Sequence, residues 1–296
     1  MNRVLIADKI DEKILTSLKQ ESIFFNYQPE INSKDLLKII SLYQGLIVRS
    51  RTKVTEEVIK AGKNLQVIGR VGSGLDNIDV VSAKKHKIKI VNASDSNTNA
   101  VAELTIALIL SLLRNLSKAH TSMSQGLWLK KELIGLELSG KTVGIIGYGH
   151  IGKKVAKLVR SFGAQIYFYS RSKKNTSLKN LFQKSDIISL HLPLTSQTEK
   201  LVNKKFLSLM KPTSFLINSG RGEVIDEKDL YDFLVTKKIA GAALDVFWQE
   251  PLPPNSPWRK MPNVILTPHI GASTNEALKK GTKTVIDEII KILSKK

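Results

Sequence analysis

Hydrophobic residues in the first hundred positions form short runs separated by segments with helical spacing. Runs rich in Val, Ile and Leu predict five strands, at residues 3–7, 23–27, 45–48, 67–70 and 88–91. The intervening segments, such as 11–20 and 55–61, carry apolar residues at helical intervals. Strands that alternate with helices are typical of a parallel sheet covered on both faces. The pattern therefore predicts a first α/β lobe.

A second, independent series of strands follows a long apolar segment, residues 100–122, that predicts one continuous helix. Strands are expected in this series at residues 143–146, 166–169, 187–190, 214–218, 241–246 and 264–266. Parallel strands joined by crossover helices in this number make a complete dinucleotide-binding sheet. A last helix, at residues 276–293, lies beyond that sheet and is expected to pack on the first lobe.

These elements predict two doubly wound parallel-sheet α/β lobes, one inserted into the other. We expect a Rossmann dinucleotide-binding domain at residues 96–272, and a flavodoxin-like substrate domain formed by residues 1–95 together with 273–296. A length of 296 residues fits two domains of about 150 residues each. The two crossings between the lobes predict a hinge.

Composition narrows the chemistry and the partners. The chain has no cysteine and five scattered histidines, which excludes disulfides, iron–sulfur clusters and thiolate catalysis and predicts no metal site. A net charge of +20 without any nucleic-acid-binding motif predicts a lysine-rich surface that favours anionic ligands, and no nucleic-acid partner. The longest apolar stretch, residues 104–113, is too short for a membrane span, and the N-terminus is unlike a signal peptide. We therefore expect a cytoplasmic protein.

The segment 147–152, Gly-Tyr-Gly-His-Ile-Gly, follows a predicted strand and opens a helix predicted at 153–161. In this context Gly147 makes the tight turn, Gly149 lets the backbone approach a pyrophosphate, and Gly152 lets helix and strand pack closely. The motif alone is weak evidence, but the strand before it, the helix after it and a second strand at the right distance make it specific. It predicts a dinucleotide site.

The end of the second strand of this domain carries Ser170 and Arg171, where an NAD enzyme usually has an acidic residue. Ser170 removes a carboxylate that would repel a 2′-phosphate, while Arg171, with Lys173 and Lys174, can pair with one. The sequence therefore predicts NADP use or weak discrimination between NAD and NADP. The alternative is that these are surface residues and that NAD binds.

Three further segments resemble, in order and spacing, the signatures of the D-isomer-specific 2-hydroxyacid dehydrogenases: residues 218–226, 245–251 and 268–274. The resemblance runs nearly end to end, through segments 97–103, 138–145 and 191–195 as well. It implies an oxidoreductase that transfers a hydride between NAD or NADP and a D-2-hydroxy acid.

The same segments supply the residue types that such a reaction needs. His269 is the expected general base for the hydroxyl proton, because an unperturbed imidazole has a pKa of about 6.5. Glu250 is expected to orient that imidazole, and Arg221 to hold the substrate carboxylate and carbonyl oxygen. Each of the three has a structural alternative when taken singly. Their places at the ends of separate predicted strands favour catalysis when they are taken together.

The resemblance extends the cofactor site beyond the glycines. The expected cofactor-binding residues are Gly147, Gly149, His150, Ile151, Gly152, Ser170, Arg171, His191, Pro193 and Asp245. Asp245 is implied to contact the nicotinamide carboxamide. His150 and His191 are expected to position the cofactor rather than to transfer protons.

The first lobe carries arginines at the ends of predicted strands. The expected substrate-binding residues are Arg49, Arg51, Arg70, Ser73, Gly74 and Asn97. A Gly-rich turn around Ser73 and Gly74 can bind a carboxylate through backbone N–H groups, and the surplus of arginines predicts a second anionic group on the substrate.

Within the family, these segments look most like those of the D-3-phosphoglycerate dehydrogenases. That resemblance implies oxidation of 3-phosphoglycerate to 3-phosphohydroxypyruvate, the entry to serine biosynthesis, with Arg49 and Arg70, and with Arg51 as a further candidate, at the phosphate and Asn97 near the substrate. The alternative is that Arg49 and Arg51 form surface ion pairs and that the protein is an NADPH-dependent glyoxylate or hydroxypyruvate reductase, which Ser170 and Arg171 favour.

Three further expectations come from the family. The helix predicted at 100–122 is implied to mediate a homodimer. The chain ends after the terminal helix, so we expect no C-terminal regulatory domain and no feedback by serine. Some relatives are dinucleotide-sensing corepressors, a distant alternative that the presence of all three catalytic residue types disfavours.

Overall fold

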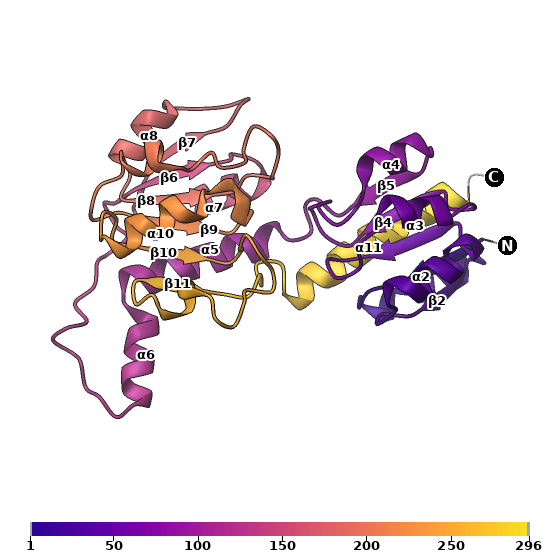
Figure 1. Ribbon diagram of the computed structural model, residues 1–296, viewed down its shortest axis with the longest axis horizontal. Coiled ribbons are helices and arrows are strands. Elements are labelled where there is room, and N and C mark those ends of the chain that lie inside the picture. The colour runs from indigo at the N-terminus through magenta and orange to yellow at the C-terminus, as the bar shows by residue number, and fades with distance from the viewer. Residues whose placement is uncertain (1, 295–296) are drawn as a thin grey trace. The chain divides into compact units, whose positions relative to one another are not determined.

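The computed structural model describes residues 2–294 and divides the chain into two compact units (Figure 1). Unit 1 comprises Met1–Asn97 and Ala272–Lys296, and unit 2 comprises Thr98–Gly271. The chain therefore leaves unit 1 once and returns to it for its last helix. Both units are parallel-sheet α/β structures, so the predicted fold class is confirmed.

The sheet of unit 1 has five parallel strands in the order β2-β1-β3-β4-β5. Its strands are β1 (Arg3–Ile6), β2 (Phe24–Tyr27), β3 (Gly45–Val48), β4 (Val67–Arg70) and β5 (Lys89–Asn92). This is the flavodoxin-like order, and each strand lies where the hydrophobic runs predicted it. The central strand β3 is buried along its whole length, as a parallel strand covered on both faces must be.

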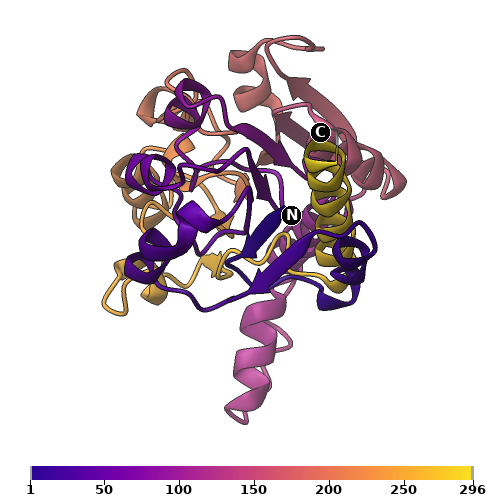
Figure 2. The same cartoon turned by 90° about the vertical axis from the view of Figure 1, so that its right-hand side faces the viewer.

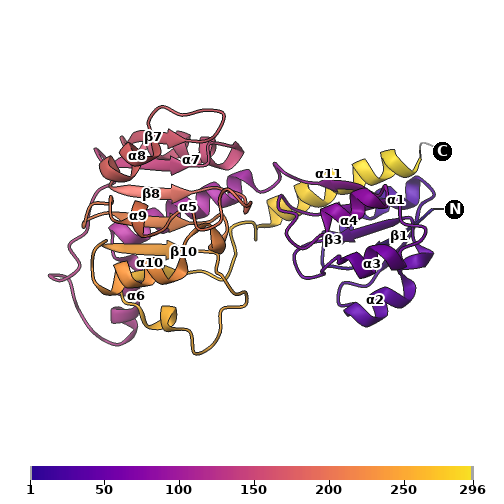
Figure 3. The same ribbon diagram turned by 45° about the horizontal axis from the view of Figure 1, so that its top comes forward.

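Helices cover both faces of this sheet. They are the 3-10 helices η1 (Glu12–Ile14) and η2 (Ile40–Leu42) and the α-helices α1 (Thr16–Gln20), α2 (Ser33–Ile39), α3 (Glu56–Ala61), α4 (Val80–Lys85) and α11 (Asn275–Leu293). Val4 and Ile6 of β1 pack with Val285 of α11 on one face, whereas Leu5 packs with Leu36 of α2 on the other. Successive strand residues point to opposite faces, so one strand packs against both helical layers. Figures 2 and 3 show helices on both sides of this sheet.

The sheet of unit 2 has six parallel strands in the order β11-β10-β9-β8-β6-β7. They are β6 (Thr142–Ile146), β7 (Gln165–Tyr169), β8 (Ile187–Leu190), β9 (Phe215–Asn218), β10 (Gly241–Leu244) and β11 (Val264–Leu266). The direction of the connections reverses between β6 and β8. Open α/β sheets bind ligands at the carboxyl ends of the strands that flank such a reversal.

Two helical layers cover this second sheet. The helices of unit 2 are α5 (Thr98–Leu113), α6 (Leu116–Ser124), α7 (His150–Ser161), α8 (Leu178–Lys184), α9 (Lys204–Leu207), η3 (Gly222–Val224), α10 (Glu227–Val235) and η4 (Pro257–Lys260). Helices α5 and α7 pack with Val143 and Ile145 on one face, and α8 and α10 pack with Ile188 and Leu190 on the other.

The prediction of one continuous helix at residues 100–122 is wrong. The segment forms two helices, α5 and α6, that meet at a bend of 67°. Asn115 causes the break: its φ of 54° and ψ of 31° are left-handed, a conformation that Asn tolerates better than most residues and that stops an α-helix. Apolar residues continue across the break, so hydrophobic periodicity alone does not reveal it.

Helix α6 and the segment after it, residues 116–136, form what we name the α6 arm. Helix α6 projects from the sheet of unit 2 (Figure 1), and Ser122 is its one buried residue. The exposed large apolar side chains of the arm are Leu116, Met123, Leu127, Trp128, Ile134 and Leu136. Across residues 2–294 no single helix is long and apolar enough to cross a membrane; α5 and α6 reach that length only as a bent pair.

Candidate functional site

The Gly-rich segment connects β6 to α7 at the reversal of the sheet. A side chain at Gly147, where φ is +97°, would collide with the backbone carbonyl of His191, and one at Gly152 would collide with the carbonyl of Gly147. At Gly149, by contrast, nothing lies within 4 Å of the position a side chain would take. The turn thus leaves open space at the N-terminus of α7, where backbone N–H groups and the helix dipole favour an anion. These residues fit the pyrophosphate of a dinucleotide.

The turn after β7 has no carboxylate. Ser170 Oγ donates to the Lys173 carbonyl at 2.7 Å and accepts from the Lys173 amide at 3.1 Å, which closes the turn. Arg171 extends from it and donates to Gln197 Oε1 at 3.0 Å. Because Arg171, Lys173 and Lys174 are exposed around this turn, positive charge surrounds the end of β7.

Three predicted site residues follow three neighbouring strands of the same sheet. Arg221 follows β9, Glu250 follows β10 and His269 follows β11. Asn218 Nδ2 donates to the Arg221 carbonyl at 2.9 Å, which fixes the turn that carries the guanidinium. The order of the strands thus gathers residues from distant parts of the sequence at one edge of unit 2.

Glu250 and His269 form a hydrogen-bonded pair. Their Oε2 and Nδ1 atoms are 2.6 Å apart, and Glu250 Oε1 accepts from the Phe247 amide at 3.0 Å. Burial by itself raises the pKa of Glu250. The hydrogen bonds from His269 and Phe247, with the charges of His269 and Arg221, outweigh burial and leave that pKa below its ordinary value. An ionised carboxylate only accepts hydrogen bonds, so Nδ1 carries a proton and Nε2 is left for another partner.

A buried carboxylate fixes the loop that carries His269. Asp245 is 1% exposed; its Oδ1 accepts from Thr267 Oγ1 at 2.6 Å and from the Ile270 amide at 2.9 Å, and its Oδ2 accepts from the Gly271 amide at 2.8 Å. Between these anchors His269 adopts a φ of +53°, a left-handed conformation that costs energy for a residue with a side chain. The bonds to Asp245 hold the backbone on both sides of His269 and so keep this residue in its left-handed conformation.

Two tryptophans anchor the segment that carries Glu250. Trp248 Nε1 donates to the Ile225 carbonyl at 2.7 Å, and Trp258 Nε1 donates to Glu227 Oε1 at 2.9 Å. The two indole rings stack with centroids 5.4 Å apart. Both ends of the segment around Glu250 are therefore attached to residues 225–227, at and just before the start of α10.

His191, which directly follows β8, is partly buried. It shares hydrogen bonds with Ser189 Oγ at 2.9 Å and Ser219 Oγ at 3.5 Å, and Ser219 in turn contacts Thr105 of α5 at 3.2 Å. Desolvation lowers the pKa of His191 to about 4, so the ring is neutral near pH 7. The other predicted cofactor residues of this region, His150, Ile151 and Pro193, lie at the start of α7 and in the segment after β8.

In unit 1, the predicted substrate residues near β4 surround one turn. The Arg70 guanidinium lies against Gly72, where any side chain would overlap it. Asn92 Nδ2 donates to the Ser73 carbonyl at 2.7 Å, and Asn97 Nδ2 to Ser73 Oγ at 3.2 Å. Within the described residues Asn97 Oδ1 is buried without a hydrogen-bond partner, so an acceptor is left over beside the turn that contains Gly74.

The two arginines after β3 have different surroundings, although the sequence grouped them. Arg51 donates to the carbonyls of Ala7, Pro29 and Ile31 and pairs with buried Asp8. Arg49 has one side-chain hydrogen bond among the described contacts, a long one of 3.3 Å to the Lys9 carbonyl. Sequence reasoning missed Asp8, Asn77 and Thr267, which hold these loops. The available signal was an acid close to the end of a buried strand, as at Asp8 and Asp245.

No three His, Cys, Asp or Glu side chains within residues 2–294 gather as a metal-binding group. The cluster in unit 2 consists of the Arg221 guanidinium, the Glu250 carboxylate and the His269 imidazole, and the glycine turn follows a strand of the same sheet. Such a set can bind a carboxylate substrate and move one proton.

Comparison with known proteins identifies the family. The family model described as D-isomer specific 2-hydroxyacid dehydrogenase, NAD binding domain, matches residues 106–271. Hydroxypyruvate reductase of Thermotoga maritima is 41% identical over 98% of this chain and 98% of that protein. D-3-phosphoglycerate dehydrogenase of Synechocystis sp. is 39% identical over 99% of this chain, which spans 54% of that protein. A solved acyclic imino acid reductase in complex with NADPH and D-Arg has a TM-score of 0.91 at 30% identity, over 99% of this chain and 98% of that one.

The chain therefore belongs to the D-isomer-specific 2-hydroxyacid dehydrogenase family, as the sequence motifs predicted. It is an oxidoreductase that uses NAD or NADP.

The depressed pKa of His191 makes stability depend on pH. In the unfolded chain His191 is protonated below about pH 6.5, whereas in the folded chain it is protonated only below about pH 4. The free energy of unfolding therefore decreases as the pH falls through this interval. Between pH 7 and pH 4, the free energy of unfolding should decrease by about 3 kcal/mol more in the wild type than in His191→Asn. Urea unfolding of both proteins at pH 7 and pH 4 measures the difference. Identical pH dependence of the two would contradict it.

Proposed function

We propose that the protein interconverts a D-2-hydroxy acid and its 2-oxo acid, and that the substrate carries a second anionic group, as 3-phosphoglycerate and 3-phosphohydroxypyruvate do. The observation that carries the proposal is the 2.6 Å contact between Glu250 and His269 at the strand ends beside Arg221. The family membership supplies the reaction type, and the arginines of unit 1 support the phosphorylated substrate.

The proposed mechanism assigns one task to each residue. The turn that contains Gly147, Gly149 and Gly152 would hold the dinucleotide, and its nicotinamide would supply the hydride chemistry between the 2-hydroxy acid and the 2-oxo acid. His269 Nε2 takes the hydroxyl proton on oxidation and returns it to the carbonyl oxygen on reduction. Glu250 orients the ring through Nδ1 and stabilises its charged form. Arg221 binds the substrate carboxylate in two-point contact.

In this proposal Arg49 and Arg70 bind the second anionic group, with Ser73, Gly74 and Asn97 near the substrate carboxylate. Arg49 directly follows β3 and Arg70 is the last residue of the adjacent strand β4, and a planar guanidinium matches phosphate geometry. The unpartnered Oδ1 of Asn97 supports a ligand at this turn. Arg51, a candidate from the sequence, has no substrate contact in this proposal, because its guanidinium is bonded within the fold.

Reduction of an unphosphorylated acid such as hydroxypyruvate or glyoxylate is the second candidate. The hydroxypyruvate reductase of Thermotoga maritima matches this chain over its whole length, which favours it. The turn at Ser170 and Arg171 also favours an NADPH-dependent reductase.

The test of the proposed function follows NAD(P)H absorbance with 3-phosphohydroxypyruvate and with hydroxypyruvate. We expect a higher kcat/KM for the phosphorylated acid, since its second charge gains contacts that hydroxypyruvate lacks. His269→Gln should lower kcat for both acids by about 10²- to 10⁴-fold, the usual range for loss of a general base.

His86→Gln is the matched control, because His86 is an exposed histidine at the end of α4. It should leave kcat unchanged. A His269→Gln enzyme with wild-type kcat would exclude the proposed proton transfer, and a higher kcat/KM for hydroxypyruvate would favour the second candidate.

We further propose a preference for NADP(H) over NAD(H), because the turn after β7 has a hydroxyl and exposed positive charges in place of a carboxylate. Ser170→Asp should reverse the preference by lowering kcat/KM for NADPH about tenfold or more, since a carboxylate there repels a 2′-phosphate. Steady-state kinetics with both cofactors measure it. Ser172→Asp, at an exposed position in the same turn, controls for added charge; a wild-type enzyme that strongly prefers NADH would contradict the proposal.

We also propose that the α6 arm mediates a homodimer. The arm exposes Trp128 at 77% and Ile134 at 84%, and apolar side chains gathered at one place on a surface mark an interface. Light scattering should give a mass of about twice 32.9 kDa, and Trp128→Glu with Ile134→Lys should halve it. A wild-type monomer at micromolar concentration would refute the dimer.

A further inference from the structure

Arg51 joins three separate segments of unit 1. Its Nη2 donates to the Ala7 carbonyl at 2.6 Å and to the Pro29 carbonyl at 2.8 Å, and its Nη1 donates to the Ile31 carbonyl at 3.1 Å. The Ala7 carbonyl directly follows β1, and the Pro29 and Ile31 carbonyls lie in the segment between β2 and α2. Arg51 itself lies in the third segment, after β3. A guanidinium that satisfies several carbonyls at once is a structural connection that a lysine cannot reproduce.

Asp8 supplies the opposite charge. The residue is 2% exposed, and its carboxylate accepts from Arg51 Nε at 3.2 Å and from Thr52 Oγ1 at 2.6 Å. It also accepts from the backbone amides of Arg49 at 2.5 Å and of Thr52 at 3.2 Å. A buried carboxylate is tolerated when it is paired and hydrogen-bonded, so Asp8 commits the charge of Arg51 to the fold.

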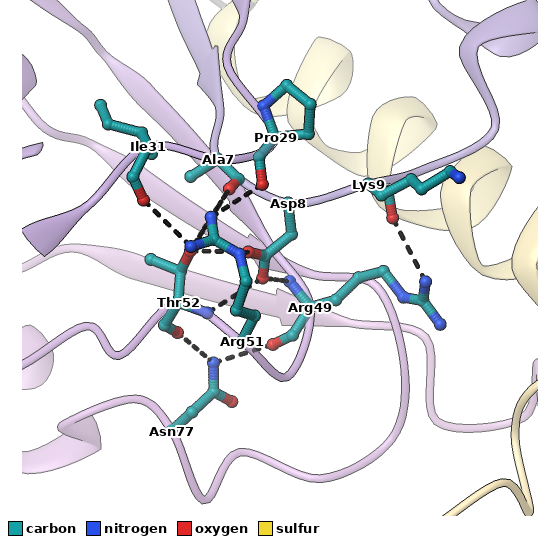
Figure 4. Close-up of polar contacts among 9 residues, drawn as sticks. All are labelled: Ala7, Asp8, Lys9, Pro29, Ile31, Arg49, Arg51, Thr52 and Asn77. Carbon is teal, nitrogen blue, oxygen red and sulfur yellow. Dashed lines mark hydrogen bonds and ion pairs between the residues drawn. The ribbon is translucent and has the colours of Figure 1, made fainter.

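The backbone of Arg49 is held from both sides. Asp8 accepts from its amide, and Asn77 Nδ2 donates to its carbonyl at 2.8 Å and to the Thr52 carbonyl at 2.7 Å. The guanidinium of Arg49 points away from that of Arg51 (Figure 4). Held at the backbone, Arg49 has a fixed origin for its side chain, which reduces the ordering that binding of an anion requires.

We propose that Asp8, Arg51 and Asn77 form a clasp that fixes the backbone of Arg49 and so sets the specificity for a substrate with a second anionic group. The proposal rests on the proposed function, in which Arg49 binds that group. The three clasp residues are positioning residues: they act through Arg49 and do not contact the substrate themselves.

The test compares KM for 3-phosphohydroxypyruvate with KM for hydroxypyruvate, two acids that differ by one phosphate group. Arg51→Lys keeps a positive charge near Asp8, but its single nitrogen cannot reach Asp8 and all three carbonyls together as the guanidinium fork does. Asn77→Ala breaks the clasp on its other side. Each variant should raise the ratio of KM for 3-phosphohydroxypyruvate to KM for hydroxypyruvate about tenfold. This is the loss of affinity expected when one charge-assisted hydrogen bond is misplaced. The kcat for both acids should change much less than this ratio.

Arg49→Ala defines the full effect on the ratio, and adding Arg51→Lys to it should cause no further change, because the clasp acts through Arg49. Lys53→Gln is the matched control: it removes an exposed charge from the same segment and should leave the ratio unchanged. Thermal unfolding establishes whether each variant is folded. If Arg51→Lys is not folded, the KM ratio of Asn77→Ala tests the clasp.

Three results would overturn the clasp, each in its own way. Additive effects of Arg49→Ala and Arg51→Lys would place Arg51 on the phosphate directly. Equal losses with both acids would reduce the clasp to general stability. An unchanged KM ratio in Arg49→Ala would contradict both the second anionic group of the proposed function and the clasp. A changed ratio in Arg49→Ala with an unchanged ratio in Arg51→Lys and Asn77→Ala would reject the clasp alone.

Discussion

Two parallel sheets, each buried on both faces, confine the polar chemistry of this protein to the ends of its strands. Strands such as β3, β8 and β10 are buried from end to end, so their side chains build the core and have no role at a ligand. Functional side chains are left to the loops that follow the carboxyl ends. Those loops need fixed conformations, and the structure meets the need with buried carboxylates.

Asp8 in unit 1 and Asp245 in unit 2 have the same role: each fixes the conformation of a neighbouring loop. Asp245 directly follows β10, and one residue separates Asp8 from the end of β1. Both carboxylates are almost fully buried. Each collects hydrogen bonds from a neighbouring loop: Asp8 from residues 49–52 and Asp245 from residues 267–271. A buried carboxylate cannot be left with unsatisfied oxygens, so the loop that satisfies it has one favoured arrangement. In each unit that loop carries a residue to which we assign a role, Arg49 or His269.

His191 and His269, two of the histidines of unit 2, differ in burial and therefore in their properties. His191 is partly buried directly after β8, and desolvation keeps its ring neutral near pH 7 as a hydrogen-bonding link between Ser189 and Ser219. The side chain of His269 is 44% exposed and faces a carboxylate, which gives its ring a fixed orientation and a free Nε2. The same side chain thus suits a structural role at the end of β8 and the proposed proton transfer at the end of β11.

Hydrophobic periodicity and glycine spacing in the sequence were sufficient to predict every strand of both sheets and the turn at residues 147–152, because these features depend on local patterns and on burial of whole segments. The motifs around Arg221, Glu250 and His269 indicated the family for the same reason. The break at Asn115 and the different partners of Arg49 and Arg51 were decided by the tertiary structure alone. A backbone can turn at one residue without a change in hydrophobic pattern, and two arginines a residue apart carry the same sequence signal. Their difference arises only when folding brings Asp8 and the carbonyls of residues 7, 29 and 31 around one guanidinium and leaves the other outside.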